Sequence, residues 1–174
     1  GTQSGKALTT GTDNTLIGGL AGDALTSSEF NVAVGKSALS ADTQGSYNVG
    51  IGALALTTQN FTSATNSYNT AVGSLAGRRI TTGISNTIFG ARAADHLTDA
   101  DFNVAIGMDA LTADTLGSGS TAVGLGALST QNFTSATYSH NTAVGFQAGL
   151  SVTTGQYNTL IGGLAGDAIT TAIY

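Results

Sequence analysis

The residues of this chain that could ligate a metal ion gather in one segment. His96 lies in AADHLTDAD, with Asp95, Asp99 and Asp101 beside it. An imidazole nitrogen and carboxylate oxygens together can hold a divalent cation. The other histidine, His140, is 44 residues away and there is no cysteine, so no zinc-site spacing occurs. The alternative is a solvated polar edge, which the absence of a metal motif favours.

A second candidate for cation binding is the segment GGLAGDA, at Gly18–Ala24 and again at Gly162–Ala168. Calcium-binding β-helices need Gly-Gly-x-Gly-x-Asp in successive turns, and the neighbouring segments of this chain lack that pattern. Gly-x-Gly runs such as the one in GIGALA have neither a strand–loop–helix context nor a following acidic residue, so they do not indicate a nucleotide site. We therefore expect no metal ion and no cofactor.

No arrangement of side chains typical of an enzyme is evident. Serine and threonine are frequent, but none lies in a strained turn with a histidine and a carboxylate assignable to it. The basic pair Arg78-Arg79 is replaced 72 residues later by Leu150-Ser151, so we interpret it as surface. The sequence predicts that the chain is not an enzyme.

Composition excludes several further classes. The chain has 174 residues, a net charge of −5, 9% charged residues and only five Lys and Arg, too few for a nucleic-acid interface. It has 25 glycines but no Pro, Cys or Trp, which excludes collagen and disulfide scaffolds. No apolar run approaches the ~18 residues of a membrane-spanning helix, and no signal peptide is recognisable. We expect neither nucleic-acid binding nor membrane insertion.

The main signal is an internal repeat. A pentapeptide of the form Asn-(Thr/Val)-x-(Val/Ile/Phe)-Gly recurs at spacings of 17, 17, 21 and 17 residues, a super-repeat of 72. The segment TQNFTSAT stands at 58–65 and again at 130–137. Such self-similarity is typical of a linear stack in which each unit contacts only its neighbours.

Within each unit we number the Asn as position one. Position five is glycine, which predicts a turn with φ > 0 or a close backbone approach. The Asn predicts a left-handed or Asx-turn residue whose side chain bonds locally or stacks along the repeat. These predicted turn residues are Gly18, Gly35, Gly52, Gly73, Gly90, Gly107, Gly124, Gly145 and Gly162, with Asn14, Asn31, Asn48, Asn69, Asn86, Asn103, Asn141 and Asn158.

These features predict an all-β fold, a parallel β-roll or β-solenoid with 17- and 21-residue rungs. We expect a single repeat domain over 1–174, with a partial rung at 1–13 and nine rungs starting at 14, 31, 48, 69, 86, 103, 120, 141 and 158. Each rung is expected to hold two short strands and two tight turns. At roughly 4.8 Å per rung, the rod is about 45–50 Å long.

The four extra residues of the 21-residue rungs are expected to bulge outward as loops. Asn60-Phe61-Thr62 and Asn132-Phe133-Thr134 lie there and match the N-glycosylation pattern. We take Asn60, Phe61, Asn132 and Phe133 as candidate partner-binding residues. A second candidate is the aromatic residue that often precedes the Asn, at Phe30, Tyr47, Tyr68, Phe102 and Tyr157, with His140 in the same place.

Both faces of each strand are apolar. Position four is Val, Ile or Phe, and position three holds small or apolar residues such as Ala33 and Leu16. A strand that is apolar on both faces is normally buried on both. One face can fill the rung, so the other needs a second surface, most simply another copy of the chain. The alternative is a monomeric solenoid wide enough to bury both faces.

The repeats resemble those of known fibres. NVAVG, NTAVG and NVAIG followed by x-x-Ala resemble the heads of YadA-like trimeric autotransporter adhesins, which form a left-handed parallel β-roll. The segments 73–90 and 145–162 resemble the NTAIG-x-x-AL-x-x-TTG repeats of bacteriophage tail fibres. The resemblance spans the chain, although its rungs are longer than those of the adhesin heads. It implies a homotrimeric fibre, extracellular, on a cell surface or on a virion, with an adhesive or spacer role.

Three functions remain open from the sequence. The first is a stiff structural or adhesive fibre segment, cut from a longer chain, whose outward loops bind a receptor or glycan. The second is a subunit that assembles head to tail into an extracellular filament, since the first and last full units are nearly identical. The third is a ligand- or ice-binding solenoid that uses Thr at position two, although Val32, Val49 and Val104 interrupt that column.

Overall fold

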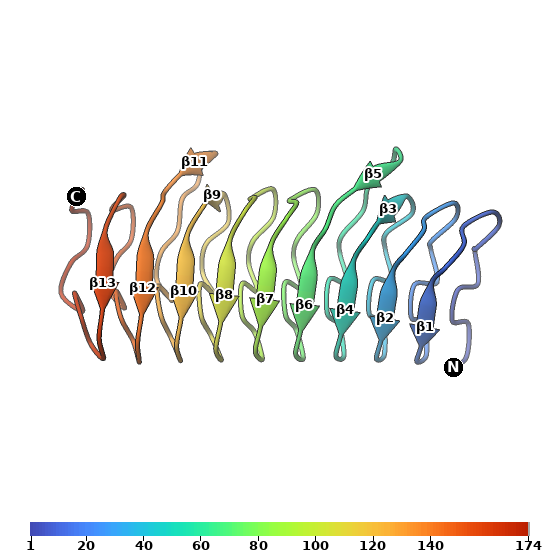
Figure 1. The fold of residues 1–174 in the computed structure, drawn as a ribbon, viewed down its shortest axis with the longest axis horizontal. Coiled ribbons are helices and arrows are strands. Elements are labelled where there is room, and N and C mark those ends of the chain that lie inside the picture. Colours follow the sequence, from blue (N-terminus) through green and yellow to red (C-terminus); the bar gives the residue numbers. More distant parts are fainter. Residues whose placement is uncertain (174) are drawn as a thin grey trace.

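The computed structural model of the chain describes residues 1–173, and these form a β-solenoid without any helix (Figure 1). The predicted all-β, parallel, stacked fold is confirmed at this level. No helix of the described residues is long and apolar enough to cross a membrane. The strands are β1 Thr15–Ile17, β2 Val32–Val34, β3 Gly45–Ser46, β4 Val49–Ile51, β5 Thr65–Asn66, β6 Thr70–Val72, β7 Thr87–Phe89, β8 Val104–Ile106, β9 Gly117–Ser118, β10 Thr121–Val123, β11 Thr137–Tyr138, β12 Thr142–Val144 and β13 Thr159–Ile161.

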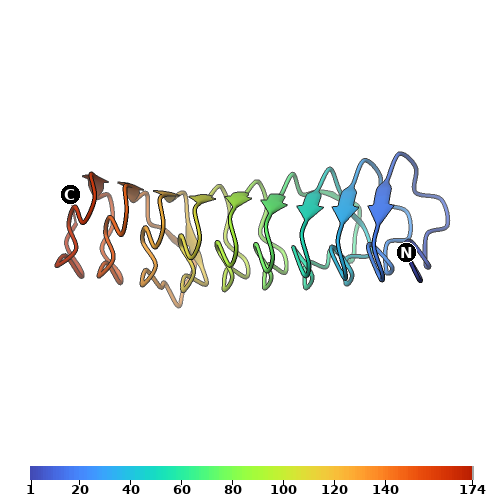
Figure 2. The same ribbon diagram turned by 90° about the horizontal axis from the view of Figure 1, so that it is seen from below.

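Nine of these strands form one parallel sheet, in the order β1-β2-β4-β6-β7-β8-β10-β12-β13. Each strand begins one residue after the first position of its repeat and pairs in register with the next, as in Thr15↔Val32 and Thr142↔Thr159. Equivalent residues therefore stack in columns along the rod. Figure 2 shows these strands along one side of the solenoid and the turns along the other.

Most rungs contain a single strand, where we predicted two. A second strand occurs only beside the insertions, where β3 pairs with β5 and β9 pairs with β11. Positions seven and nine have positive φ in every full rung, for example Leu54 (62°) and Leu56 (50°). The stretch that follows the glycine turn is therefore curled and is not extended as a strand would be.

The structure settles which face of the strand points inward. Position three is buried in seven of the nine strands, whereas positions two and four face outward. Small and large residues complement each other across the narrow interior. A Cβ on Gly22 would lie 2.7 Å from the side chain of Leu16, while Leu39 packs against Gly50, where a Cβ would be 3.4 Å away. The alanines of position eight fill the remaining space in the core.

Candidate functional surfaces

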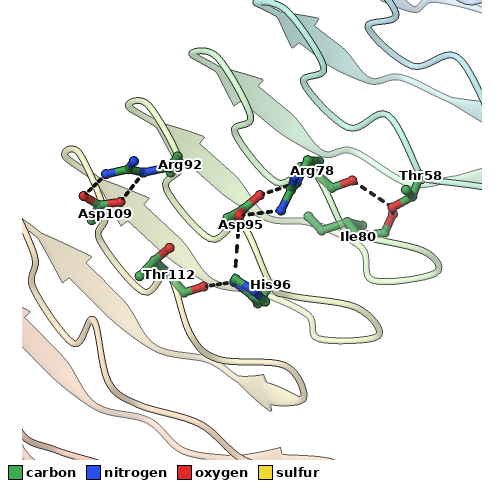
Figure 3. Close-up of polar contacts among 8 residues, drawn as sticks. All are labelled: Thr58, Arg78, Ile80, Arg92, Asp95, His96, Asp109 and Thr112. Atoms are coloured by element: carbon green, nitrogen blue, oxygen red, sulfur yellow. Dashed lines mark hydrogen bonds and ion pairs between the residues drawn. The ribbon is translucent and has the colours of Figure 1, made fainter.

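The predicted metal ligands are engaged in contacts between rungs. The imidazole Nδ1 of His96 lies 2.9 Å from the carbonyl oxygen of Thr112 and 3.8 Å from Asp95 Oδ2 (Figure 3). Asp99 accepts a hydrogen bond from the hydroxyl of Thr82, and Asp101 accepts one from the Ile84 amide at 2.7 Å. In residues 1–173 no three His, Asp or Glu side chains converge where they could hold a metal ion. The segment forms a polar edge.

Two bidentate ion pairs join adjacent rungs on this edge. Arg78 donates to Asp95 at 2.8 and 2.9 Å, and Arg92 donates to Asp109 at 2.7 and 2.6 Å (Figure 3). The hydrogen bond and the charge of Asp109 raise the pKa of Arg92 above its ordinary value. Each pair spans 17 residues, so its partners occupy equivalent positions of consecutive rungs. These charges have a structural role as clamps along the rod.

The asparagines of position one form the same hydrogen bonds between consecutive rungs along the repeat. The backbone N–H of Asn31 donates to Asn14 Oδ1 at 3.0 Å, and the same bond recurs at Asn48, Asn86 and Asn103. The side-chain amide of Asn31 also donates to the Gly45 carbonyl. The asparagine side chains therefore form a ladder along the rod. The left-handed conformation belongs to the residue before each Asn, not to the Asn itself.

The glycines of position five sit where consecutive rungs approach most closely. Gly90 has φ 138°, and a Cβ there would lie 2.5 Å from the carbonyl oxygen of Gly107. The members from Gly18 to Gly145 have the same arrangement, with φ between 130° and 139°, whereas Gly162 (φ 125°) meets only Ala165 Cβ at 3.9 Å. Both the turn and the close approach that the sequence predicted are thus present from Gly18 to Gly145.

The insertion loops project at the edge marked by β5 and β11 (Figure 1), but their phenylalanines do not. The side chains of Phe61 and Phe133 are only 7% and 5% exposed, so they cannot serve as the partner-binding rings that we expected. Asn60 and Asn132 are exposed, and their Oδ1 atoms accept hydrogen bonds from Thr43 and Thr115. The rings are not available to a ligand because they are buried against the solenoid, where they hold each loop in place.

Beneath each loop lies a buried carboxylate that sequence reasoning missed. Asp42 is fully buried and accepts hydrogen bonds from the Gly45 and Phe61 amides, at 3.0 and 3.1 Å, and from Gln59 Nε2 at 2.6 Å. Gln59 in turn accepts one from Asn69. Asp114 and Gln131 repeat this network one super-repeat later.

The outer face of the nine-stranded sheet is a continuous row of apolar and Thr side chains. Its eighteen outward side chains comprise twelve Val, Ile or Phe and six Thr, with no charged residue. Ile17, Phe89 and Ile161 are between 56% and 70% exposed. The face extends over eight rung spacings, about 38 Å. Large continuous patches of exposed apolar side chains commonly mark interaction surfaces.

The residue before each Asn forms a second exposed column. Phe30, Tyr47 and Tyr68 stack on one another, with ring centroids 5.0 and 5.2 Å apart. His140 stacks with Tyr138 at 5.7 Å and with Tyr157 at 5.5 Å. Stacking of exposed rings at this spacing stabilises adjacent rungs and leaves ring surface in contact with solvent.

Comparisons with protein-family models, with curated proteins and with solved structures found no match. Among the described residues, three exposed surfaces could contact a partner. They are the outer sheet face, the aromatic column and the tips of the two loops.

Proposed function

We propose that the chain is a structural and adhesive segment of an extracellular or virion fibre, in which copies associate through the outer face of the nine-stranded sheet. The observation that supports this proposal is the composition of that face: it is apolar or Thr throughout and carries no charge. The resemblance to adhesin heads and tail fibres supplies the expected stoichiometry of three and the location.

Two features of the outer sheet face favour another copy of the chain as its binding partner. Equivalent outward residues recur at every rung, so two such faces have matching ridges along their whole length. An uncharged face also presents no repulsion to itself, and its Val and Thr side chains are short enough for close approach. Twelve of the eighteen outward side chains are apolar, and each Å² of apolar surface that association removes from water contributes about 25 cal/mol in its favour.

Light scattering coupled to size exclusion tests the proposal on the full chain. We expect a species of about 52 kDa, which is three times 17.2 kDa. Val123→Glu places a charge on β10, within the face, and should release monomer. Ala113→Glu lies on a turn outside the sheet and should leave the trimer intact. A wild-type monomer at micromolar concentration would overturn the proposal, and threads that lengthen with concentration would support the head-to-tail filament instead.

One observation favours a second candidate function on the same face. Thr15, Thr70, Thr87, Thr121, Thr142 and Thr159 all project outward from a sheet with uniform register. A flat array of threonine hydroxyls and methyls is the arrangement expected of an ice- or ligand-binding solenoid. Thermal hysteresis of the wild-type chain, compared with Thr121→Lys, tests this candidate. Activity that is lost in the variant would replace self-association as the role of the face.

A further inference from the structure

The aromatic column has a regular geometry that fixes the spacing of its side chains. Every described residue that precedes a first position has φ between 46° and 75°, from Asp13 to Tyr157. Their side chains therefore leave the backbone in the same way. Rings on adjacent rungs lie 5.0 to 5.5 Å apart, close to the ~4.8 Å spacing of the rungs. Each rung without a ring must then leave a gap in the stack.

Ser85 creates such a gap between Tyr68 and Phe102. The Ser85 amide donates to the Ser67 carbonyl at 2.8 Å, and the Phe102 amide donates to the Ile84 carbonyl at 3.1 Å. These bonds place Tyr68, Ser85 and Phe102 on three consecutive rungs. The two rings are therefore separated by two rung spacings, about 10 Å. Tyr68 and Phe102 are each 53% exposed, compared with 41% for Tyr47 inside the stack.

The other ring-free position inside the column is filled from a loop. Gly119 lies beside β9, and the loop strand β11 brings Tyr138 into register with Ser118. The Tyr138 ring stacks on His140 at 5.7 Å, and a Cβ on Gly119 would lie only 2.9 Å from His140 Nδ1. Within the described residues, Ser85 is thus the interior position of the column that lacks a ring and receives none.

The gap has the dimensions and chemistry of a site for one six-membered ring. Its ~10 Å equals two stacking distances of about 5 Å, so a single ring can contact both walls. The Ser85 hydroxyl has no hydrogen-bond partner in residues 1–173. Asp101 receives the Ile84 amide on Oδ1, while its Oδ2 has no donor there. Two exposed rings, with the Ser85 hydroxyl on the rung between them and the Asp101 carboxylate next to Phe102 in the sequence, suit a ring with C–H faces and hydroxyls on its rim.

We propose that Tyr68 and Phe102 hold one pyranose ring of a glycan between them, with Ser85 and Asp101 bonding its hydroxyl groups. This inference specifies the ligand class of the adhesive role proposed above and rests on that role. A flat aromatic side chain from a partner protein would also fit between two rings. The sugar is favoured because Ser85 Oγ and Asp101 Oδ2 have no hydrogen-bond partner in residues 1–173, and an apolar ring that covered them would remove their water without replacing its hydrogen bonds.

Saturation-transfer NMR with simple sugars tests the proposal. The probes are methyl β-D-glucopyranoside, methyl β-D-galactopyranoside and methyl N-acetyl-β-D-glucosaminide, each with the full chain. We expect transfer to the ring C–H protons of at least one probe. Tyrosine fluorescence gives a second readout, because the chain has no Trp and four of its five tyrosines lie on this edge. Ser85→Tyr should weaken binding at least tenfold by filling the slot, since other rings of the column adopt the same φ.

Two further variants test whether sugar binding depends on the gap between Tyr68 and Phe102. Asp13→Tyr adds a ring to the same column beyond Phe30, away from the slot, and should leave sugar binding unchanged. Phe102→Ala removes one wall and should abolish binding without unfolding, because that ring is half exposed. The proposal is overturned if none of the three sugars gives transfer, if binding survives in both Ser85→Tyr and Phe102→Ala, or if p-cresol binds more tightly than every sugar. Light scattering on the same samples reports the oligomer separately, so failure of the slot is distinguishable from failure of the fibre assembly.

Discussion

At the scale of single residues, the fold is set by positions where the chemistry of one side chain is obligatory. Gly90 illustrates the strictest case, because φ 138° and a carbonyl oxygen 2.5 Å from its missing Cβ exclude every other residue. Ala in position eight is constrained by interior volume, and Asn in position one by hydrogen bonds that join three rungs. The Gly and Ala requirements recur in every full rung and the Asn requirement in all but the rung of Ser120, which explains why the sequence signal is so regular.

Gly90→Ala is therefore expected to destabilise the chain by about 2–4 kcal/mol, from backbone strain and from overlap with Gly107. Gly163→Ala is the matched control, since no atom lies within 4 Å of its Cβ position and its φ is not positive. Thermal unfolding followed by circular dichroism measures both. Equal melting temperatures for the two variants would contradict the close-approach explanation.

The surroundings of Asp23 predict a substitution that stabilises the chain. Its Oδ1 is buried without a hydrogen-bond partner, although Asp95, the equivalent residue one super-repeat later, is clamped by Arg78. Lys6 occupies the place of Arg78. Lys6→Arg should supply the missing bidentate bonds and stabilise the chain by about 1 kcal/mol. The double variant Lys6→Arg, Asp23→Ala should lose that gain, and a gain that persists would place its origin elsewhere.

At the scale of elements, the period of the repeat was sufficient to predict the stacked rungs, the glycine turns and the outward loops. It could not tell which strand face points inward, because both faces are apolar, and the structure shows that position three does. It also led to the wrong role for Phe61 and Phe133, whose loop context suggested exposure. A usable signal was present at position twelve, which is apolar in most rungs but is Asp42 and Gln59 around the insertion.

The network of Asp42 predicts a local effect on the loop. Asp42→Ala leaves the Gly45 and Phe61 amides and the Gln59 side chain without their acceptor, which should cost about 3–5 kcal/mol. Hydrogen exchange of the Gly45 and Phe61 amides should accelerate far more than exchange in β7. Asp99→Ala removes an exposed carboxylate with one bond to Thr82 and serves as the control. Uniform acceleration along the chain would show that the network does not act on the loop.

At the scale of the whole molecule, the two super-repeats have similar core residues but differ in their exposed residues at position six. Position six, just beyond the sheet, is Lys36, Ala53 and Ser74 in the first super-repeat. The equivalent residues of the second are Met108, Leu125 and Phe146, all more than 40% exposed. Exposed apolar side chains therefore follow β8, β10 and β12, whereas Lys36, Ala53 and Ser74 follow β2, β4 and β6. If copies associate through the sheet face and these adjoining side chains, the half around β8, β10 and β12 contributes more of the binding free energy.

This difference between the two super-repeats predicts which half of the chain contributes more to self-association. Phe146→Ser introduces the residue found at the equivalent position 74, so the fold should tolerate it. Loss of one aromatic ring from the interface should weaken association by about 1.4–2.8 kcal/mol, on the order of 10- to 100-fold in the dissociation constant. Ser74→Phe is the reciprocal variant and should strengthen association. Sedimentation velocity over a dilution series measures both, and identical dissociation of Phe146→Ser and wild type would place the interface away from this half of the sheet.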